Sequence, residues 1–336
     1  MKTPVSGKTT GARIPSRTNI FLSVVFFFSQ IYLLFLFPFA FQKTPALALA
    51  GLLVTVVMIL PTWYLMHEAV HDHLHQNIKV GFWLGRLLSA ISGVPFSGIR
   101  VAHLLHHRWN RIEDFSENYE PTELNWLNAN AKYFFLILGG LYWLEFLGGL
   151  MLFLPERLRL RLAAAVAGKN IYMNRVYHAM NNYKNAIRTR NESILIAALY
   201  IGSFCAYGPH LRILLIAALC GRAFLVSLLD NSFHYEAGTN PGDNSSGTRD
   251  HSMPASWLIL NFNYHWTHHK HPGAPWTDLP MLAQREGAKF EGNYITQAFR
   301  QFKGAIAIET SAEASDRAVA KSGATTESSA GAELSF

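Results

Sequence analysis

The chain is poor in charged residues and in cysteine, and both shortages narrow its class. Only 15% of its 336 residues are charged, whereas about a quarter are charged in a typical soluble domain. Its two cysteines, Cys205 and Cys220, lie inside apolar runs, where a free cysteine packs as a small hydrophobic side chain. We therefore expect neither a disulfide framework nor cysteine metal ligands. The low charge favours a membrane protein over a soluble one.

Long apolar runs explain the low charge. The runs at residues 20–41 and about 46–66 are each close to the ~20 residues that a helix needs to cross a bilayer. The first is longer than the ~7–15-residue apolar core of a cleavable signal peptide, so we interpret it as a membrane span. Further apolar runs follow at residues 133–154, 194–207 and 211–229. The runs predict an all-α, multi-pass integral membrane protein.

Two copies of one histidine pattern stand outside the apolar runs. They are His103-Leu104-Leu105-His106-His107 and His265-Trp266-Thr267-His268-His269, and His67 and His71 precede them at H-x-x-x-H spacing. Residues three or four apart share one face of a helix, and imidazole suits iron, zinc, copper and nickel. These three motifs, the histidine boxes, therefore predict a metal site.

The first box is ambiguous, because His71 and His75 have the same spacing as His67 and His71. We prefer His67 and His71, since an acidic residue follows His67 and the pair lies nearest to the second apolar run. Carboxylates often orient metal-bound imidazoles, and the candidates here are Glu68, Asp72, Asp114, Asp230 and Glu236. We expect the remaining histidines to lie outside direct metal binding: His73, His75, His178, His210, His251 and His271.

The distribution of basic residues predicts the orientation. Lys and Arg gather in segments 1–19 and 155–192, and basic loops beside spans are typical of the cytoplasmic side. The same distribution disfavours nucleic-acid binding, despite a net charge of +7. If the boxes share one compartment, the chain has four transmembrane helices in two hairpins, 20–66 and 194–229, and run 133–154 is interfacial or re-entrant. A cytoplasmic helical cap would then hold the metal site.

The domain organisation follows from the same runs. Residues 1–19 form a basic cytoplasmic tail, and residues 20–303 form the membrane domain. Residues 304–336 are rich in Ala, Ser, Thr, Gly and Glu and lack the side chains that bury a core, so we expect this tail to be disordered.

The ordered boxes, H-E-A-V-H, H-L-L-H-H and H-W-T-H-H, resemble those of the membrane fatty-acid desaturase superfamily. The resemblance covers about residues 20–285 and includes Trp109-Asn110 after the second box and His271-Pro272, Pro275-Trp276 and Leu279-Pro280 after the third. It implies a di-iron centre on the cytoplasmic face, with O2 as co-substrate. The implied ligands are His67, His71, His103, His106, His107, His265, His268 and His269, with His234 as a ninth.

The resemblance also implies a water-mediated contact near His234. Related acyl-CoA enzymes carry an Asn four residues before this histidine, which reaches iron through water, whereas this chain has Asp230 there and Asn231 beside it. Asp230 matches the position on a helix, and Asn231 matches the chemistry. Both stay candidates.

The implied reaction is oxygen-dependent desaturation of a fatty acyl chain. Unactivated C–H bonds offer no acidic or basic handle, so a metal–oxygen oxidant is needed. The substrate supplies two of the four electrons that reduce oxygen to water, and an external donor (ferredoxin, rubredoxin or cytochrome b5, with its reductase) would supply the rest. The alternative within the superfamily is hydroxylation or ketolation of a carotenoid or another apolar lipid.

Two functions of other classes also fit single features. His67-Glu68-Ala69-Val70-His71 is a literal H-E-x-x-H, the zinc metalloprotease motif, but a protease leaves both H-x-x-H-H boxes unexplained. A metal transporter would place histidines within its spans, whereas these boxes flank the spans. We therefore favour the di-iron enzyme.

Overall fold

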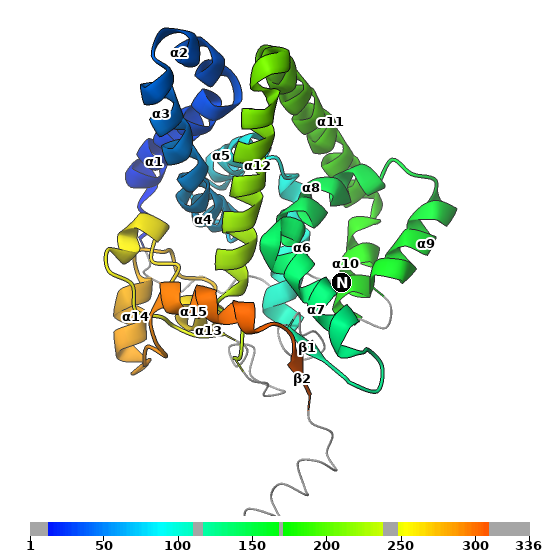
Figure 1. Cartoon of the computed structure of the whole chain (residues 1–336). Coiled ribbons are helices and arrows are strands. Elements are labelled where there is room, and N and C mark those ends of the chain that lie inside the picture. The colour runs from blue at the N-terminus through cyan, green and yellow to red at the C-terminus, as the bar shows by residue number, and fades with distance from the viewer. Residues whose placement is uncertain (1–12, 110–116, 168–170, 238–247, 309–336) are drawn as a thin grey trace, which may run out of the picture. The chain divides into compact units, whose positions relative to one another are not determined.

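The structure is a computed structural model that describes residues 13–109, 117–167, 171–237 and 248–308. Most of these residues are helical and the described strands are only two residues long (Figure 1), which confirms the all-α prediction. They divide into two compact units. The first contains the described residues up to 109 and from 135 to 302, and the second contains those at 117–134 and 303–308.

The first unit contains the predicted membrane hairpins and all three boxes. Its elements before the first gap in the description are α1 (Ser16–Ile31), η1 (Tyr32–Leu36), α2 (Phe37–Lys43), α3 (Pro45–Val57), α4 (Ile59–Val70), α5 (Ile78–Ser92) and α6 (Phe96–Trp109). Its middle elements are η2 (Leu136–Gly140), α8 (Leu141–Met151), α9 (Glu156–Ala167), α10 (Ile171–Met180), α11 (Tyr183–Ala206) and α12 (Gly208–Asn231). Its last elements are η3 (Ser256–Ile259), α13 (His265–Lys270), α14 (Leu279–Arg285) and α15 (Tyr294–Arg300), after which η4 (Gln301–Lys303) crosses into the second unit.

The second unit is built on a short parallel pair of strands and the helix α7 (Trp126–Phe135). In the pair, β1 (Asn118–Tyr119) lies beside β2 (Ile306–Ala307). Ala305 N donates a hydrogen bond to Asn130 Oδ1 at 3.0 Å. The beginning of the predicted disordered tail thus forms a strand. Residues 309–336 of that tail, and residues 1–12 of the basic N-terminal tail, lie outside the described residues.

Four helical segments of the described chain are long and apolar enough to cross a membrane: Ser16–Lys43, Pro45–Val70, Trp126–Met151 and Gly208–Asn231. Their number is the predicted one, and all but Trp126–Met151 coincide with predicted spans. The sequence favours an interfacial or re-entrant position for the third. It is continuous enough to qualify as a span, although Gly139, at φ 129°, breaks its helical geometry.

Helix α11, which the sequence predicts to form the second hairpin with α12, does not qualify as a span by composition. Its N-terminal half carries Lys184, Arg188, Arg190 and Glu192. Its C-terminal end nevertheless packs beside the first span, where Ser203 Oγ donates to Leu34 O at 2.7 Å. The charged half therefore lies toward the boxes and the apolar half away from them.

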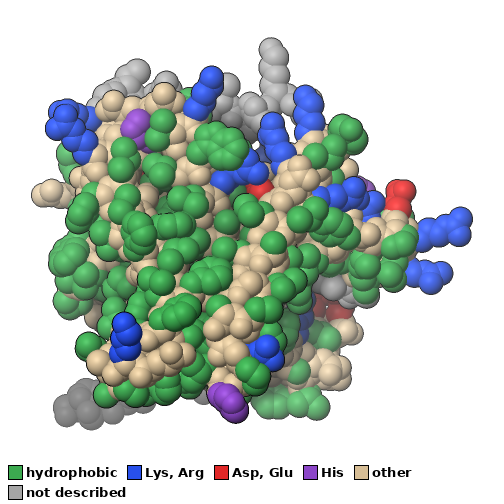
Figure 2. All heavy atoms as spheres, turned by 90° about the horizontal axis from the view of Figure 1, so that it is seen from above, with side chains coloured by type: hydrophobic (Ala, Val, Ile, Leu, Met, Phe, Trp, Pro, Cys, Tyr) green, Lys and Arg blue, Asp and Glu red, His purple; other side chains and the backbone are tan. Residues whose placement is uncertain are grey.

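Both hairpins turn at the same end of the first unit (Figure 1). The ring of Phe37, near the first turn, stacks on Tyr207 at the second, with centroids 5.5 Å apart. Consequently, α4 and α12 both end at the opposite side, where His67, His71 and His234 stand. Seen from the side of the turns, hydrophobic side chains lie among backbone and polar atoms, with Lys and Arg side chains at the margins (Figure 2). The candidate spans expose large hydrophobic side chains along their length, among them Phe21, Leu53 and Ile213, as expected of helices that contact lipid.

Candidate metal centre

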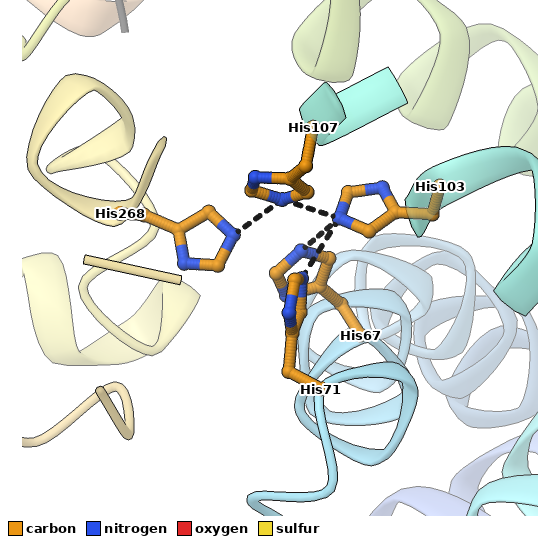
Figure 3. Close-up of side chains that lie close together, drawn as sticks. All are labelled: His67, His71, His103, His107 and His268. Atoms are coloured by element: carbon orange, nitrogen blue, oxygen red, sulfur yellow. Dashed lines mark hydrogen bonds between the residues drawn. The ribbon is translucent and has the colours of Figure 1, made fainter. Parts of the chain in front are cut away.

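Five histidines converge at the inner ends of three helices. His67 lies in α4 and His71 directly follows it, His103 and His107 belong to α6, and His268 belongs to α13. One ring nitrogen of each lies within 4.8 Å of the others (Figure 3). All three boxes therefore contribute to this first group.

The imidazoles of the first group face one another through their Nε2 atoms. His103 Nε2 lies 2.8 Å from that of His67 and 3.0 Å from that of His71. His107 Nε2 lies 2.9 Å from His103 Nε2 and 3.0 Å from His268 Nε2. The five rings thus turn the same nitrogen toward one small volume (Figure 3).

Four other histidines form a second group: His106, His234, His265 and His269, whose ring nitrogens also lie within 4.8 Å of one another. His234, which belongs to no box, has its Nε2 atom 3.3 Å from that of His265. The two groups adjoin, because the ring of His107 in the first stacks on that of His269 in the second, with centroids 4.1 Å apart. The nine histidines singled out in the sequence are the members of these two groups.

Helical geometry explains why each H-x-x-H-H box serves both groups. Residues four apart lie on nearly the same face, whereas the residue three along is displaced by about 60° around the axis. In the second box, His103 and His107 enter the first group and His106 enters the second. In the third box, His265 and His269 enter the second group and His268 the first. The two boxes therefore divide in a complementary way.

Burial keeps the clustered imidazoles neutral. It lowers the pKa of His71, His265 and His269 well below the usual value, and it lowers the pKa of His268 to about 3. A neutral imidazole presents a lone pair and binds a metal through it. His269 Nε2 is buried and has no hydrogen-bond partner among the described residues. A cation would satisfy that nitrogen, so the donor set fits a metal ion in each group.

An ion pair joins the first box to the second. Arg100 of α6 donates to Asp72 Oδ1 at 3.0 Å and to Asp72 Oδ2 at 2.7 Å. It also donates to the carbonyl oxygen of Ala69 at 3.2 Å. Asp72 adopts a positive φ of 64° directly after His71. The sequence makes Asp72 a candidate for orienting an imidazole, whereas its carboxylate is occupied by Arg100 and fixes the end of α4 against α6.

Glu68 likewise connects chain segments. Its Oε2 accepts a hydrogen bond from Trp276 N at 3.1 Å, and the indole nitrogen of Trp276 donates to Asn19 Oδ1 at 3.0 Å. Asn19 in turn donates to Leu74 O at 3.0 Å. Glu68 therefore links the first box to the Pro-Trp motif that follows the third. In a zinc protease the same Glu would act as the general base.

The remaining candidates for orienting an imidazole are Glu236, Asp114 and Asp230, and Asn231 is considered with them. Glu236 pairs with Arg300 at 2.6 Å, and Asp114 lies outside the described residues. Asp230 is in neither histidine group, and the side-chain amide of Asn231 donates to Gln301 Oε1 at 2.8 Å. These contacts leave the water-mediated role of Asp230 or Asn231 a prediction.

Sequence reasoning missed Asp250, which holds the third box in place. Its Oδ1 accepts a hydrogen bond from Thr267 N at 3.1 Å, and its Oδ2 accepts one from Thr267 Oγ1 at 2.6 Å. Burial raises the pKa of Asp250 to about 6, so the carboxylate is ionised at neutral pH. Thr267 lies between His265 and His268, and the contact therefore fixes the start of the short helix α13.

The histidines expected to stand apart are in neither group. His75 Nδ1 accepts a hydrogen bond from Asn77 N at 2.9 Å, so the alternative pairing of the first box is not observed. His271 lies 3.0 Å from Glu286. His73 is buried, and its ring stacks beside that of His71 with centroids 6.0 Å apart.

Comparison with models of protein families identifies the same family that the three histidine boxes resemble. The model of the fatty acid desaturase family matches residues 43–301. The chain belongs to this family. No curated protein matches it. The matched range includes both histidine groups and Asp250, and it confirms the resemblance read from the boxes.

Membership of the fatty acid desaturase family makes the protein a membrane oxidoreductase of the desaturase or hydroxylase type. It also removes support for the protease interpretation. The first group contains five imidazoles from three boxes, whereas a catalytic zinc site has three protein ligands. The histidines gather at the ends of the candidate spans, which is also unlike a transport path through them.

Proposed function

We propose that the two histidine groups bind two iron ions and that the protein uses O2 to introduce a double bond into a fatty acyl chain. The observation that carries this proposal is the division of nine histidines into adjacent groups of five and four. Iron bound there would supply the oxygen chemistry that an unactivated C–H bond requires. Family membership supports the same class of reaction.

The chain's own residues would hold and shield the ions. Phe262 lies edge-on to His67 with centroids 4.8 Å apart, and Phe233 stacks on His265 at 4.6 Å. Both phenylalanines are buried. They keep the imidazole rings in place and exclude water from one side of the site, and water exclusion limits side reactions of reactive oxygen species.

The second group has one imidazole fewer than the first. Asp230 stands one helical turn before His234, a member of that group. We propose that Asp230 or Asn231 acts on the second ion through a water molecule. Such a residue positions the site rather than binding the ion directly.

The reaction needs an external electron donor, which must reach the metal centre from one side of the membrane. The substrate supplies two of the four electrons, so we propose an external ferredoxin, rubredoxin or cytochrome b5, with its reductase, for the other two. Lys2, Lys8, Arg13 and Arg17 precede the first candidate span, and the second candidate span returns the chain to the same side at His67. The positive-inside rule thus supports a cytoplasmic position for the metal centre.

Lipid analysis of a host that expresses the chain tests the reaction. We expect new unsaturated acyl chains, each lacking two hydrogens relative to its precursor. The matched control is the His269→Ala variant at equal membrane abundance, which should give none. A product that gains oxygen, on an acyl chain or on a carotenoid, would replace desaturation with hydroxylation or ketolation.

A further inference from the structure

A groove with a volume of about 560 Å³ lies between α5, the start of α6 and α11. This volume falls within the usual range of small-molecule sites, about 300–1,000 Å³. Its walls are mainly apolar and include Trp83, Leu87 and Leu195. Its charged lining residues are Lys79, Arg86 and Glu192.

The charges of the groove leave one cation available. Arg86 Nε lies 2.9 Å from Glu192 Oε1, and the Arg86 guanidinium also lies over the Trp83 ring at 4.7 Å from its centroid. These two charges therefore compensate each other. Lys79 is exposed at the beginning of α5, and no ion pair found in the described chain includes its ammonium group. A ligand with a single negative charge would complement it.

The walls of the groove face outward. Trp83 is 63% exposed, Leu195 is 59% exposed, and Leu87 is 43% exposed. Helix α5 follows the second candidate span after a short connection. Tryptophan and lysine are common where a membrane protein meets the headgroup region, because each has an apolar body and a polar tip. The surroundings of the groove are therefore those of a bilayer interface.

The groove does not open toward the histidines of the first box. Gly85 of α5 packs so closely on Ala69 of α4 that a Cβ atom there would collide with the Ala69 side chain. Ala69 is two residues from both His67 and His71, which places it about 200° around the helix from each. Helix α5 thus covers the face of α4 opposite to the metal ligands. An acyl chain in the groove would be separated from them by α4.

We propose that this groove binds an anionic phospholipid of the bilayer, with its acyl chain along Trp83, Leu87 and Leu195 and its head group at Lys79. The bound lipid is distinct from the substrate, because it lies behind α4. The lipid would also stabilise the position of α6, the helix that carries the second box. Glu192 in the groove accepts hydrogen bonds from Ser97 N at 2.8 Å and Ser97 Oγ at 2.9 Å, at the start of α6.

Fluorescence quenching by brominated lipids tests the proposal. Detergent-purified protein is titrated with dibrominated phosphatidylglycerol, which is anionic, and with dibrominated phosphatidylcholine, which is zwitterionic. We expect stronger quenching by phosphatidylglycerol. The Trp83→Phe variant should lose that difference, although seven of the eight tryptophans remain. The matched Trp257→Phe variant, which removes another exposed indole, should keep it.

Two further variants test the head group and the chain. Lys79→Gln should weaken phosphatidylglycerol binding about five-fold, the loss expected when one lysine leaves an anionic lipid surface. Lys43→Gln, at the end of α2, should not. Ala90→Phe should fill the groove and weaken binding of both lipids, and circular dichroism of each variant checks that its helices are intact.

Three results would overturn the proposal. The first is equal quenching of the wild-type protein by the two lipids. The second is an unchanged affinity of Lys79→Gln for phosphatidylglycerol. The third comes from competition for the brominated lipid. If a free fatty acid displaces it at a lower concentration than unlabelled phosphatidylglycerol does, the groove binds a fatty acid instead.

Discussion

Replacing Asp250 by Ala should loosen the third box without removing a histidine. The carboxylate accepts hydrogen bonds from Thr267 N at 3.1 Å and from Thr267 Oγ1 at 2.6 Å. A hydrogen bond to a charged group contributes about 1.5–3 kcal/mol, and both donors would lose their partner inside a buried site. We therefore expect the free energy of unfolding to fall by about 3 kcal/mol or more.

The same substitution should weaken iron binding by no more than about 10-fold, the lower end of the loss seen when a direct hydrogen-bond partner of a ligand is removed, because Asp250 acts on the ligands only through Thr267. Competition with a chelator measures this affinity, and thermal unfolding in detergent measures stability. Thr267→Val removes only the hydroxyl group and keeps the backbone donor, so we expect a loss of about 1–2 kcal/mol. Glu156→Ala, at the exposed start of α9, is the control. An Asp250→Ala protein that resists the chelator as well as the wild type would refute the role of Asp250.

Three other predictions follow from individual contacts. His234→Gln should lose iron and activity, because His234 Nε2 lies 3.3 Å from His265 Nε2 in the second group. The control variant His178→Gln should retain both. A His234→Gln protein that keeps its iron and activity would show that only eight histidines form the site. Glu192→Ala should lower the free energy of unfolding by about 1–3 kcal/mol, since it leaves the buried Ser97 N and Oγ without an acceptor. A thermal midpoint equal to that of Glu156→Ala would contradict this. Burial lowers the pKa of His251 from 6.5 to about 4, so the unfolded chain takes up the proton first and stability falls as the pH drops from about 6.5 toward 4. His251→Leu should reduce this acid-induced loss, and an unchanged pH profile of thermal unfolding would rule out a contribution from His251.

The clustering of the histidines was predictable because helix geometry acts over a few residues. Spacings of three and four are enough to place His103, His106 and His107 on one side of a helix. Spacing could not show that His106 joins a different group from its neighbours, because that depends on where α13 packs. Asp250 was not predictable for a similar reason. Its partner Thr267 is 17 residues away, and no local pattern marks the pair.

The membrane topology was only partly predictable. The first hairpin followed from two uninterrupted apolar runs. The choice between residues 133–154 and 194–207 depended on charge and parity, and the helix Trp126–Met151 proves long and apolar enough to cross. Its extent was hidden because Asn128, Asn130 and Lys132 interrupt the segment before the apolar run begins. Packing, which sequence hydropathy does not report, places the charged half of α11 near the boxes.

The pairing of the two histidine groups also depends on packing between distant segments. His107 and His269 are far apart in the chain, yet their rings stack with centroids 4.1 Å apart. Hydrophobic contacts of Phe233 and Phe262 with His265 and His67 set the spacing of these elements. The sequence predicted which side chains gather, and the packing of α4, α6 and α13 determines how they divide.

The metal content of the detergent-purified protein, with Mössbauer spectroscopy of the iron-57-loaded sample, tests the central claim most directly. We predict two irons per chain, negligible zinc, and a spectrum that reports two iron sites. The single variants His103→Ala and His106→Ala should each disturb a different one of these sites. One zinc per chain with negligible iron, or a single iron shared by all nine histidines, would contradict the account.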